Sequence, residues 1–235
     1  MTPPARGVSV IVPTYREALN LPELCERLAA VRANYGLVLE VLIMDDDSRD
    51  GSREWAQMHA PSWVRLVVRR ERRGLALAVV DGLALASHPY LVVMDADLSH
   101  PPERIPAMLD LLDRGHDFVI GSRYVSGAST DERWHWLRAL NSRIATLLAR
   151  PLTSARDPMA GFLAFRRELV EGGAELDPIG FKIGLELIVK CGVERLGEIP
   201  IHFSDRHAGE SKLGLKEQLR YLLHLGRLYR YRFGP

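Results

Sequence analysis

Two carboxylates at the end of an apolar run are the residues of this sequence with the clearest potential for chemistry. Asp95 and Asp97 directly follow the run Tyr90–Met94. Side chains at positions i and i+2 of an extended segment leave the same face, so both carboxylates can reach one ligand. A hard divalent cation such as Mg²⁺ or Mn²⁺ binds a few carboxylates and shares its remaining positions with phosphate and water. The pair predicts a site for a metal-bound diphosphate, although Asp-x-Asp is also common in solvated loops.

The first half of the chain alternates apolar strands with helical patterns. We expect strands at residues 8–12, 38–44, 63–68, 90–94 and 117–120. We expect helices from Asn20, where Asn20 and Glu23 have the spacing of a capping box, and at residues 52–59, 75–86 and 102–112. Near-continuous apolar strands separated by helices predict an α/β fold, a doubly wound, mostly parallel sheet with helices on both faces.

Polar residues follow four of these strands. The segments are Pro13–Glu17, Asp45–Gly51, Asp95–Asp97 and Gly121–Tyr124. Three of them carry carboxylates and the last carries an arginine. Because ligands of such sheets bind at the carboxyl ends of the strands, we expect these four segments to converge on one site.

After residue 124 the alternation stops and the residues become more basic. Acidic residues outnumber basic ones over residues 1–118, and the reverse holds over 119–235. The patterns predict basic amphipathic helices at 133–150 and 215–233, a turn at 157–161, a helix at 180–191, a strand at 199–203 and a polar loop at 205–212.

Several classes of protein are disfavoured. The chain has 235 residues, 47% of them hydrophobic and 26% charged, which is ordinary for a globular protein. It contains no GxGxxG, no P-loop, no HExxH and no GxSxG motif. Cys25 and Cys191 are isolated, no apolar run could span a membrane, and the N-terminus lacks the apolar region of a signal peptide. No nucleic-acid-binding module is present, so we expect no nucleic acid partner.

The motifs PTYRE, DDDSRDGS, MDADLSHPP, GSRY, DPMAGF and DRHAGESKL occur in this order. In order and spacing they resemble inverting family-two glycosyltransferases, in particular dolichol- and polyprenol-phosphate mannose synthases. The resemblance covers roughly residues 8–225. It implies a nucleotide-sugar transferase fold of the GT-A type in a single domain, 1–235, with a nucleotide-binding half over about 1–124 and an acceptor-binding half over about 125–235.

The resemblance also implies roles for individual residues. The donor would be held by Pro13, Tyr15, Glu17, Asp46, Asp95, Ala96, Asp97, Arg206 and Lys212. The metal would be held by Asp95, Asp97 and Ser99, and the acceptor phosphate by Arg123 and Arg138. The catalytic residues would be Asp97, Arg123 and Arg206. Three further carboxylates, Asp45, Asp47 and Asp50, are expected to be structural, Asp45 as a strand-end acceptor and Asp50 as a helix N-cap.

Three positions depart from the usual pattern of these relatives. Ser99 stands where many carry Gln, Met159-Ala160 replaces Thr-Ser, and Leu163 replaces an Arg. The first change leaves the preferred metal open. The other two leave open the sugar and acceptor pocket, including whether the donor is GDP-mannose.

The function implied is metal-dependent transfer of mannose, with inversion, from GDP-mannose to a polyprenyl (dolichyl-type) phosphate. The alternatives are transfer from a UDP-sugar of the glucose type to undecaprenyl phosphate, and a non-catalytic nucleotide- or lipid-binding subunit. A phosphate monoester has a second pKa near ~6, so the acceptor is largely a dianion at neutral pH and hardly needs a general base. Accordingly His100, His202 and His207 are interpreted as packing or loop residues.

The expected location is the cytoplasm, with the protein attached peripherally to the cytoplasmic face of a membrane. Helices 133–150 and 215–233 combine basic with apolar and aromatic residues, which suits an anionic membrane surface. The alternative is that both helices pack on the sheet or on each other while their arginines reach water. The loop 205–212, with Gly209, is expected to close over bound phosphates.

Overall fold

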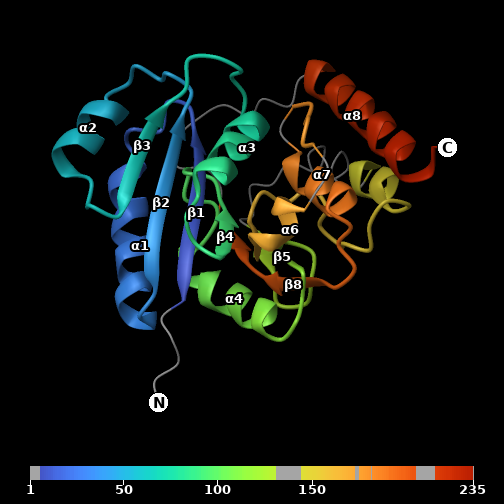
Figure 1. Ribbon diagram of the computed structural model, residues 1–235, viewed down its shortest axis with the longest axis horizontal. Coiled ribbons are helices and arrows are strands. Elements are labelled where there is room, and N and C mark those ends of the chain that lie inside the picture. Colours follow the sequence, from blue (N-terminus) through green and yellow to red (C-terminus); the bar gives the residue numbers. More distant parts are fainter. Residues whose placement is uncertain (1–5, 131–143, 173–174, 181, 205–214, 235) are drawn as a thin grey trace.

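The structure, a computed structural model, describes residues 6–130, 144–172, 175–180, 182–204 and 215–234 (Figure 1). In this part of the chain a seven-stranded sheet has the order β3-β2-β1-β4-β7-β5-β8. Its strands are β1 (Gly7–Thr14), β2 (Val38–Asp45), β3 (Val64–Val68), β4 (Tyr90–Val93), β5 (Phe118–Ser122), β7 (Leu163–Arg166) and β8 (Leu196–Pro200). A separate pair joins β6 (Ser129–Thr130) to β9 (His202–Phe203).

Parallel pairing dominates the sheet, as the sequence predicted. Strand β1 lies parallel to both β2 and β4, and β5 lies parallel to β8. The exception is β7, which is antiparallel to β4 on one side and to β5 on the other. This strand was not predicted from the sequence, because four residues are too few to display an alternating pattern. The antiparallel insertion means that β4 and β5 are separated by β7.

Helices cover both faces of the sheet. On one face α1 (Leu21–Tyr35) and α4 (Ile105–Asp113), preceded by the short η1 (Pro102–Arg104), pack against alternate residues of β1 such as Val10. On the other face α3 (Leu75–Leu85) and α7 (Ile183–Lys190) pack against the intervening residues, including Ile11. The remaining helices are α2 (Ser52–His59), α6 (Glu168–Glu171) and α8 (Leu215–Phe233).

Two expected helix caps are wrong in detail. Helix α1 begins after Asn20, but the Asn20 side chain makes no capping hydrogen bond and instead donates to Glu17 at 2.6 Å. Pro22 at the start of the helix removes one of the amide donors that such a cap would satisfy. The N-cap of α2 is Gly51 rather than Asp50. Asp50 nevertheless serves this helix start, because it accepts hydrogen bonds from the amide and hydroxyl of Ser52.

The second half follows the predicted order with shifted boundaries. The strand expected at 199–203 is divided between β8 and β9, and the helix expected at 180–191 spans Ile183–Lys190. Residues 144–149 are helical, while the rest of the expected helix 133–150 lies mostly outside the described residues. Pro200 ends β8, and the chain then changes partner from β5 to β6.

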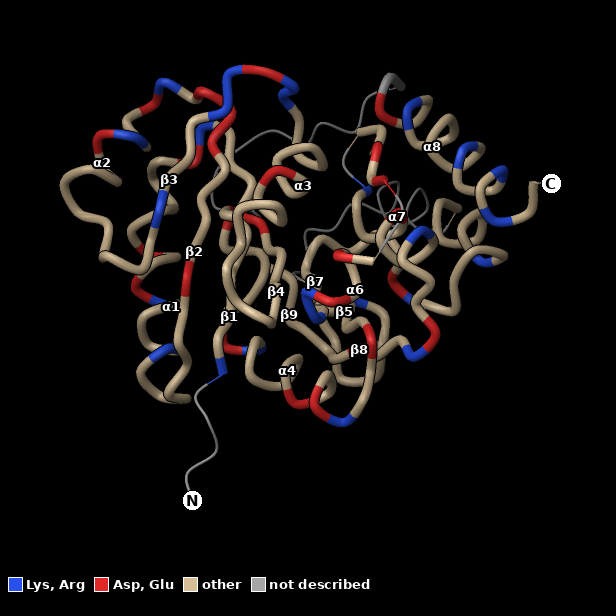
Figure 2. Tube along the Cα trace, viewed as in Figure 1, with Lys and Arg blue, Asp and Glu red and all other residues tan. Residues whose placement is uncertain are grey.

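Helix α8 packs against α7 and the 144–149 helix with one face. Leu225 and Leu228 are buried there, and the hydroxyls of Tyr221 and Tyr229 donate to carbonyl oxygens of the 144–149 helix. The other face exposes leucines and arginines, and basic residues recur along α8 in Figure 2. In the described residues no helix combines the length and apolarity needed to cross a membrane.

Candidate functional site

The two carboxylates of the Asp-x-Asp motif lie directly after β4. Asp97 is 4% exposed and accepts hydrogen bonds at its Oδ1 from the amide (3.2 Å) and hydroxyl (2.5 Å) of Ser99. The turn between them passes through Leu98 in the left-handed region, with φ 64°. A branched residue in this region is strained, and such strain concentrates at functional sites. The Ser99 hydroxyl, predicted as a metal ligand, fixes the orientation of the Asp97 carboxylate.

His100 supports the same turn through contacts of its ring. Its Nδ1 accepts the Asp95 amide hydrogen at 3.0 Å, and its ring stacks on Phe162 at a centroid distance of 5.4 Å. The ring is 2% exposed. A nitrogen that accepts from an amide carries no proton of its own, so His100 is a positioning and packing residue, in agreement with the interpretation from sequence.

The Asp95 side chain faces Gly161 of the DPMAGF segment. A Cβ at this position would lie 3.6 Å and 3.7 Å from the two carboxylate oxygens and 3.2 Å from the His100 ring. Glycine therefore leaves room beside the carboxylate. Two carboxylates with adjoining space fit a hard divalent cation, which prefers oxygen ligands and retains phosphate and water. Within the described residues no group of three or more His, Cys, Asp or Glu surrounds a common point, so ligands from a diphosphate or water would complete such a site.

Arg123, at the end of β5, is held by a buried carboxylate. Its Nε and Nη2 donate to the two oxygens of Asp157 at 2.8 Å each, and Asp157 also accepts the Arg123 amide at 3.0 Å. The Asp157 side chain is inaccessible to solvent. The guanidinium lies over the Phe203 ring at 5.3 Å. This bidentate pair and stacking fix one orientation of the guanidinium plane.

The charge of Arg123 is stabilised despite its burial. Burial by itself would lower its pKa, but the hydrogen bond and charge of Asp157, with smaller contributions from Tyr124 and Asp95, raise the pKa above the usual value. Asp95 and Arg123 therefore share one electrostatic environment. The structure brings the predicted metal ligand and the predicted phosphate-binding arginine together at the ends of β4 and β5.

Lys182 is a candidate site residue that the sequence did not indicate. Its ammonium group donates to the carbonyl oxygen of Met159 at 3.3 Å, beside the segment that carries Asp157. Burial, followed by repulsion from Arg123, lowers its pKa to about 7, against the opposing attraction of Asp157 and Asp95. A lysine whose pKa is near neutrality, and which lies beside two carboxylates and an arginine, is a candidate for binding an anion. Nothing in the local sequence identifies it, because it stands at the start of a helix with an apolar pattern.

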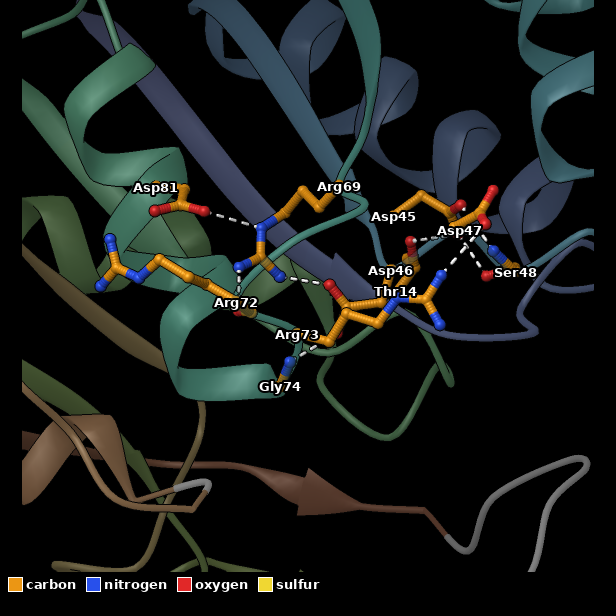
Figure 3. Close-up of polar contacts among 10 residues, drawn as sticks. All are labelled: Thr14, Asp45, Asp46, Asp47, Ser48, Arg69, Arg72, Arg73, Gly74 and Asp81. Carbon is orange, nitrogen blue, oxygen red and sulfur yellow. Dashed lines mark hydrogen bonds and ion pairs between the residues drawn. The ribbon is translucent and has the colours of Figure 1, made fainter.

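The carboxylates after β2 are largely engaged inside the protein. Asp45 accepts hydrogen bonds from the Ser48 amide and hydroxyl and from Thr14, which confirms it as a strand-end acceptor. Asp46 pairs with the buried Arg69 and accepts the Gly74 amide at 2.7 Å (Figure 3). Arg69 also bonds Asp81 at 2.9 Å. Asp46 thus ties β2 to the loop after β3; its role in holding the donor stays a prediction.

The segment after β1 reaches the same edge. Its backbone is fixed by Ser48 and Asp50, which accept the amide hydrogens of Arg16 and Ala18 at 2.9 Å each. Tyr15 is 43% exposed, with the Arg16 guanidinium 5.2 Å from its ring centroid. Three further residues were predicted to hold the sugar donor. Of these, Pro13 and Ala96 are buried, and Glu17 is partly buried.

Three predicted site residues, Arg138, Arg206 and Lys212, lie outside the described residues, as does the whole of the predicted lid at 205–212. Among the described residues, the ends of β1 and β2 meet through hydrogen bonds, and the ends of β4 and β5 meet around Arg123. One edge of the sheet therefore carries a carboxylate pair suited to a cation next to cationic groups suited to phosphates.

The family model for glycosyl transferase family 2 matches residues 9–173. This chain belongs to that family. Among curated relatives, a dolichol-phosphate mannosyltransferase of Mycosarcoma maydis is 43% identical over 235 residues, covering 96% of this chain and 80% of that protein. A dolichol-phosphate mannosyltransferase of Pyrococcus furiosus is 43% identical over 229 residues, covering 95% of this chain but only 64% of that protein. The family resemblance read from the motifs is confirmed, and the chain is a glycosyltransferase.

A solved structure supports the fold. Glucosyl-3-phosphoglycerate synthase of Mycobacterium tuberculosis, in complex with Mn²⁺, UDP and glucosyl-3-phosphoglycerate, superposes with a TM-score of 0.67 at 21% identity. The match covers 97% of this chain and 80% of that one. The GT-A-like α/β fold predicted from the sequence is therefore confirmed.

Proposed function

We propose that this glycosyltransferase transfers mannose from GDP-mannose to a polyprenyl phosphate, with inversion and with the help of a divalent cation. The observation that carries the proposal is the electrostatic contact of Asp95, the partner of Asp97 in the Asp-x-Asp pair, with Arg123 and Lys182 at one edge of the sheet. Two similar proteins, 43% identical to this chain, are named dolichol-phosphate mannosyltransferases, which supports the mannosyl group and the class of acceptor.

The donor diphosphate would lie against the carboxylate pair. Asp95 and Asp97 would hold Mg²⁺ or Mn²⁺, which supplies neutralisation of the diphosphate charge as the glycosidic bond breaks. Ser99 holds the Asp97 carboxylate in place, and the His100 ring holds the Asp95 backbone. Preorganised groups of this kind stabilise developing charge without reorganising during the reaction.

The acceptor phosphate would lie near Arg123. An arginine anchored through Nε and Nη2 by Asp157 presents its remaining edge in a fixed direction, which orients a phosphate oxygen toward the anomeric carbon. A phosphate monoester is mostly a dianion at neutral pH, so its oxygen can attack without prior loss of a proton. Attack from the side opposite the departing diphosphate gives inversion.

The polyprenyl chain implies a membrane surface beside the acceptor site. Helix α8 exposes Leu219, Leu222 and Leu223, each more than half exposed, and the neighbouring 144–149 helix exposes Leu147 at 70%. Basic residues Arg220, Arg227 and Arg230 accompany them. We infer that this surface lies on the anionic cytoplasmic face of a membrane, where each basic residue is worth about 1 kcal/mol.

A donor panel tests the proposal. GDP-mannose, GDP-glucose, UDP-glucose and UDP-mannose, each labelled in the sugar, are incubated with purified protein, a polyprenyl phosphate and Mn²⁺ or Mg²⁺. We expect label from GDP-mannose in the lipid phase, a β-linked product by NMR, and loss of transfer in EDTA. Transfer from a UDP-sugar only would instead support the second reading of the sequence, and transfer from no donor would overturn the proposal.

A further inference from the structure

The carboxylate that binds Arg123 lies in a segment without helix or strand. Residues 153–161 lie between the 144–149 helix and β7 and contain no regular secondary structure, yet Asp157, Pro158 and Met159 are buried. Backbone amides in such a segment lack the partners that a helix or a sheet provides, so other acceptors must bind them. The position of Asp157 therefore depends on hydrogen bonds made outside the regular elements.

Glu198, on β8, accepts two of these hydrogen bonds. Its Oε2 accepts the amide hydrogen of Arg156 at 2.9 Å, and its Oε1 accepts the amide hydrogen of Asp157 at 3.1 Å. A hydrogen bond to a carboxylate is roughly twice as strong as one between neutral groups. Two consecutive amides bound to the two oxygens of one carboxylate fix both the position and the direction of the backbone at Asp157.

Two adjacent strands hold Asp157 from different sides. Strand β8 lies parallel to β5, and Glu198 is paired with Ile120, three residues before Arg123 (Figure 1). Arg123 binds the Asp157 side chain through Nε, Nη2 and its own amide. Glu198 binds the Asp157 backbone. The pair of strands therefore fixes one buried carboxylate and, through it, the plane of the Arg123 guanidinium.

We propose that Glu198 is a positioning residue of the transfer reaction, which sets the orientation of Arg123 toward the acceptor phosphate through the backbone at Asp157. The inference rests on the proposed function, because it uses the role of Arg123 at the acceptor phosphate. It deepens that function by naming a residue that acts on the reaction through another side chain. A displacement of about 1 Å at a reacting centre can lower the rate by 10²-fold, so the anchoring of Asp157 has a large effect on transfer.

A positioning role and a purely stabilising role predict different kinetics. A residue that only stabilises the fold changes the free energy of unfolding and the amount of folded protein, but not the constants of the folded enzyme for one substrate. A residue that orients Arg123 changes kcat/KM for the acceptor. It leaves KM for the nucleotide sugar unchanged, because the donor is proposed to lie against Asp95 and Asp97.

Two substitutions of Glu198 test the role. Glu198→Gln keeps the size of the side chain but replaces one acceptor oxygen with an NH₂ group, which would face an amide donor. Glu198→Asp keeps the charge but withdraws the carboxylate by one methylene. In steady-state transfer to a polyprenyl phosphate, both should lower kcat/KM for the acceptor by about tenfold or more. KM for the nucleotide sugar should stay within about twofold of wild type. Circular dichroism at the assay temperature gives the folded fraction used to calculate kcat.

A double-mutant cycle with Arg123→Lys shows whether Glu198 acts through Arg123. Lysine keeps the positive charge but lacks the planar fork that Asp157 binds, so this variant alone should lower kcat/KM for the acceptor by about tenfold or more. Adding Glu198→Gln to it should cost less than about twofold further, because the orientation that Glu198 maintains is already lost. Glu194→Gln is the matched control, since Glu194 is exposed just before β8, and it should stay within about twofold of wild type.

The outcomes separate this inference from the proposed function. A loss in Arg123→Lys, with unchanged acceptor kinetics in both Glu198 variants or with fully additive losses in the double variant, overturns the inference alone. Unchanged acceptor kinetics in Arg123→Lys, or no transfer by wild type from any donor, overturns the proposed function and the inference together. Losses that are specific to the acceptor and not additive establish the positioning role of Glu198.

Discussion

The edge of the sheet at the ends of β1, β2, β4 and β5 is the proposed nucleotide site and is called the nucleotide edge below. The contacts that stabilise this edge differ from those that stabilise the α8 side of the molecule. At the nucleotide edge, short directional contacts join strand ends, such as the buried Arg69 between Asp46 and Asp81. On the other side, α8 is held mainly by apolar contacts of Leu225 and Leu228 with α7 and the 144–149 helix. Polar contacts accompany this packing, from the Tyr221 and Tyr229 hydroxyls and the Arg227–Asp177 pair to the buried approach of His224 Nε2 to Glu186 Oε2 at 3.1 Å.

This difference matches the demands of the two proposed ligands. Charged groups that stabilise a diphosphate must be held within a fraction of an ångström, and directional hydrogen bonds achieve this. A lipid chain and a membrane surface require area rather than exact positions, which non-directional apolar packing provides. We therefore expect the nucleotide edge to respond sharply to single polar substitutions, and the α8 side to respond gradually.

The largest effect is expected at the carboxylate pair. Asp97→Ala should lower transfer from GDP-mannose by roughly 10³-fold, because a single carboxylate is insufficient to hold the cation against the diphosphate. Circular dichroism should show an intact fold. Ser99→Ala removes only the hydroxyl that orients Asp97 and should lower transfer by about tenfold. Near-normal turnover of Asp97→Ala in EDTA-treated buffer would eliminate the metal role of this residue.

The second effect concerns the buried pair Asp157–Arg123, beside the proposed acceptor site. Asp157→Asn leaves Arg123, which is 12% exposed, beside a neutral amide. Removing one charge of a buried pair should lower the free energy of unfolding by about 3 kcal/mol in urea titrations. The matched control is Arg27→Gln, which breaks an exposed pair with Glu103 and should cost about 1 kcal/mol or less. Equal losses in the two variants would show that Asp157 does not anchor a charged Arg123.

The third effect is a pH dependence of donor binding. The pKa of Lys182 is lowered to about 7, so in the absence of ligand the side chain loses its positive charge as pH rises through neutrality. An anionic donor binds the protonated form better. The affinity for GDP-mannose, measured by calorimetry without metal, should therefore fall by up to about tenfold between pH 6 and pH 8.

Lys182→Met is the control for this pH dependence. It should bind GDP-mannose more weakly at pH 6 and show a flat profile over the same range. GDP-mannose is used rather than GDP, because the terminal phosphate of GDP itself titrates near pH 6 and would add its own pH dependence. A wild-type profile that is flat, or that rises with pH, would remove Lys182 from the donor site.

The smallest effects are expected on the α8 side. Leu223→Asp introduces a charge at a position that is 57% exposed, so the fold should be retained. Sedimentation with vesicles of phosphatidylserine and phosphatidylcholine should show binding at low salt that weakens at high salt and is several-fold weaker in this variant. Leu85→Asp, at a 43% exposed position on α3, should bind like wild type. Equal binding of the two variants would exclude α8 as the membrane-facing surface.

Much of the first half of the chain could be predicted because its signals are local. The run Val41–Met44 is apolar along its whole length and fully buried, as in a strand covered on both faces. The Asp-x-Asp pair follows another such strand directly, so its place at the sheet edge follows from the sequence. The insertion of β7 could not be predicted in this way, since pairing partners of a four-residue strand are chosen by the rest of the sheet.

The sequence by itself determined the strand ends that carry the chemistry and, through its motifs, the enzyme family. Only the tertiary structure decided which charges meet. Asp157 and Arg123 are 34 residues apart, and Asp46 and Arg69 are 23 apart, so no local pattern reports either pair. Lys182 gains its lowered pKa from burial and from Arg123, and both exist only after the chain has folded. The pKa of an ionisable group and the energy of its ion pairs depend on the neighbouring charges in space and on the water removed around the group. Neither is encoded at a single position.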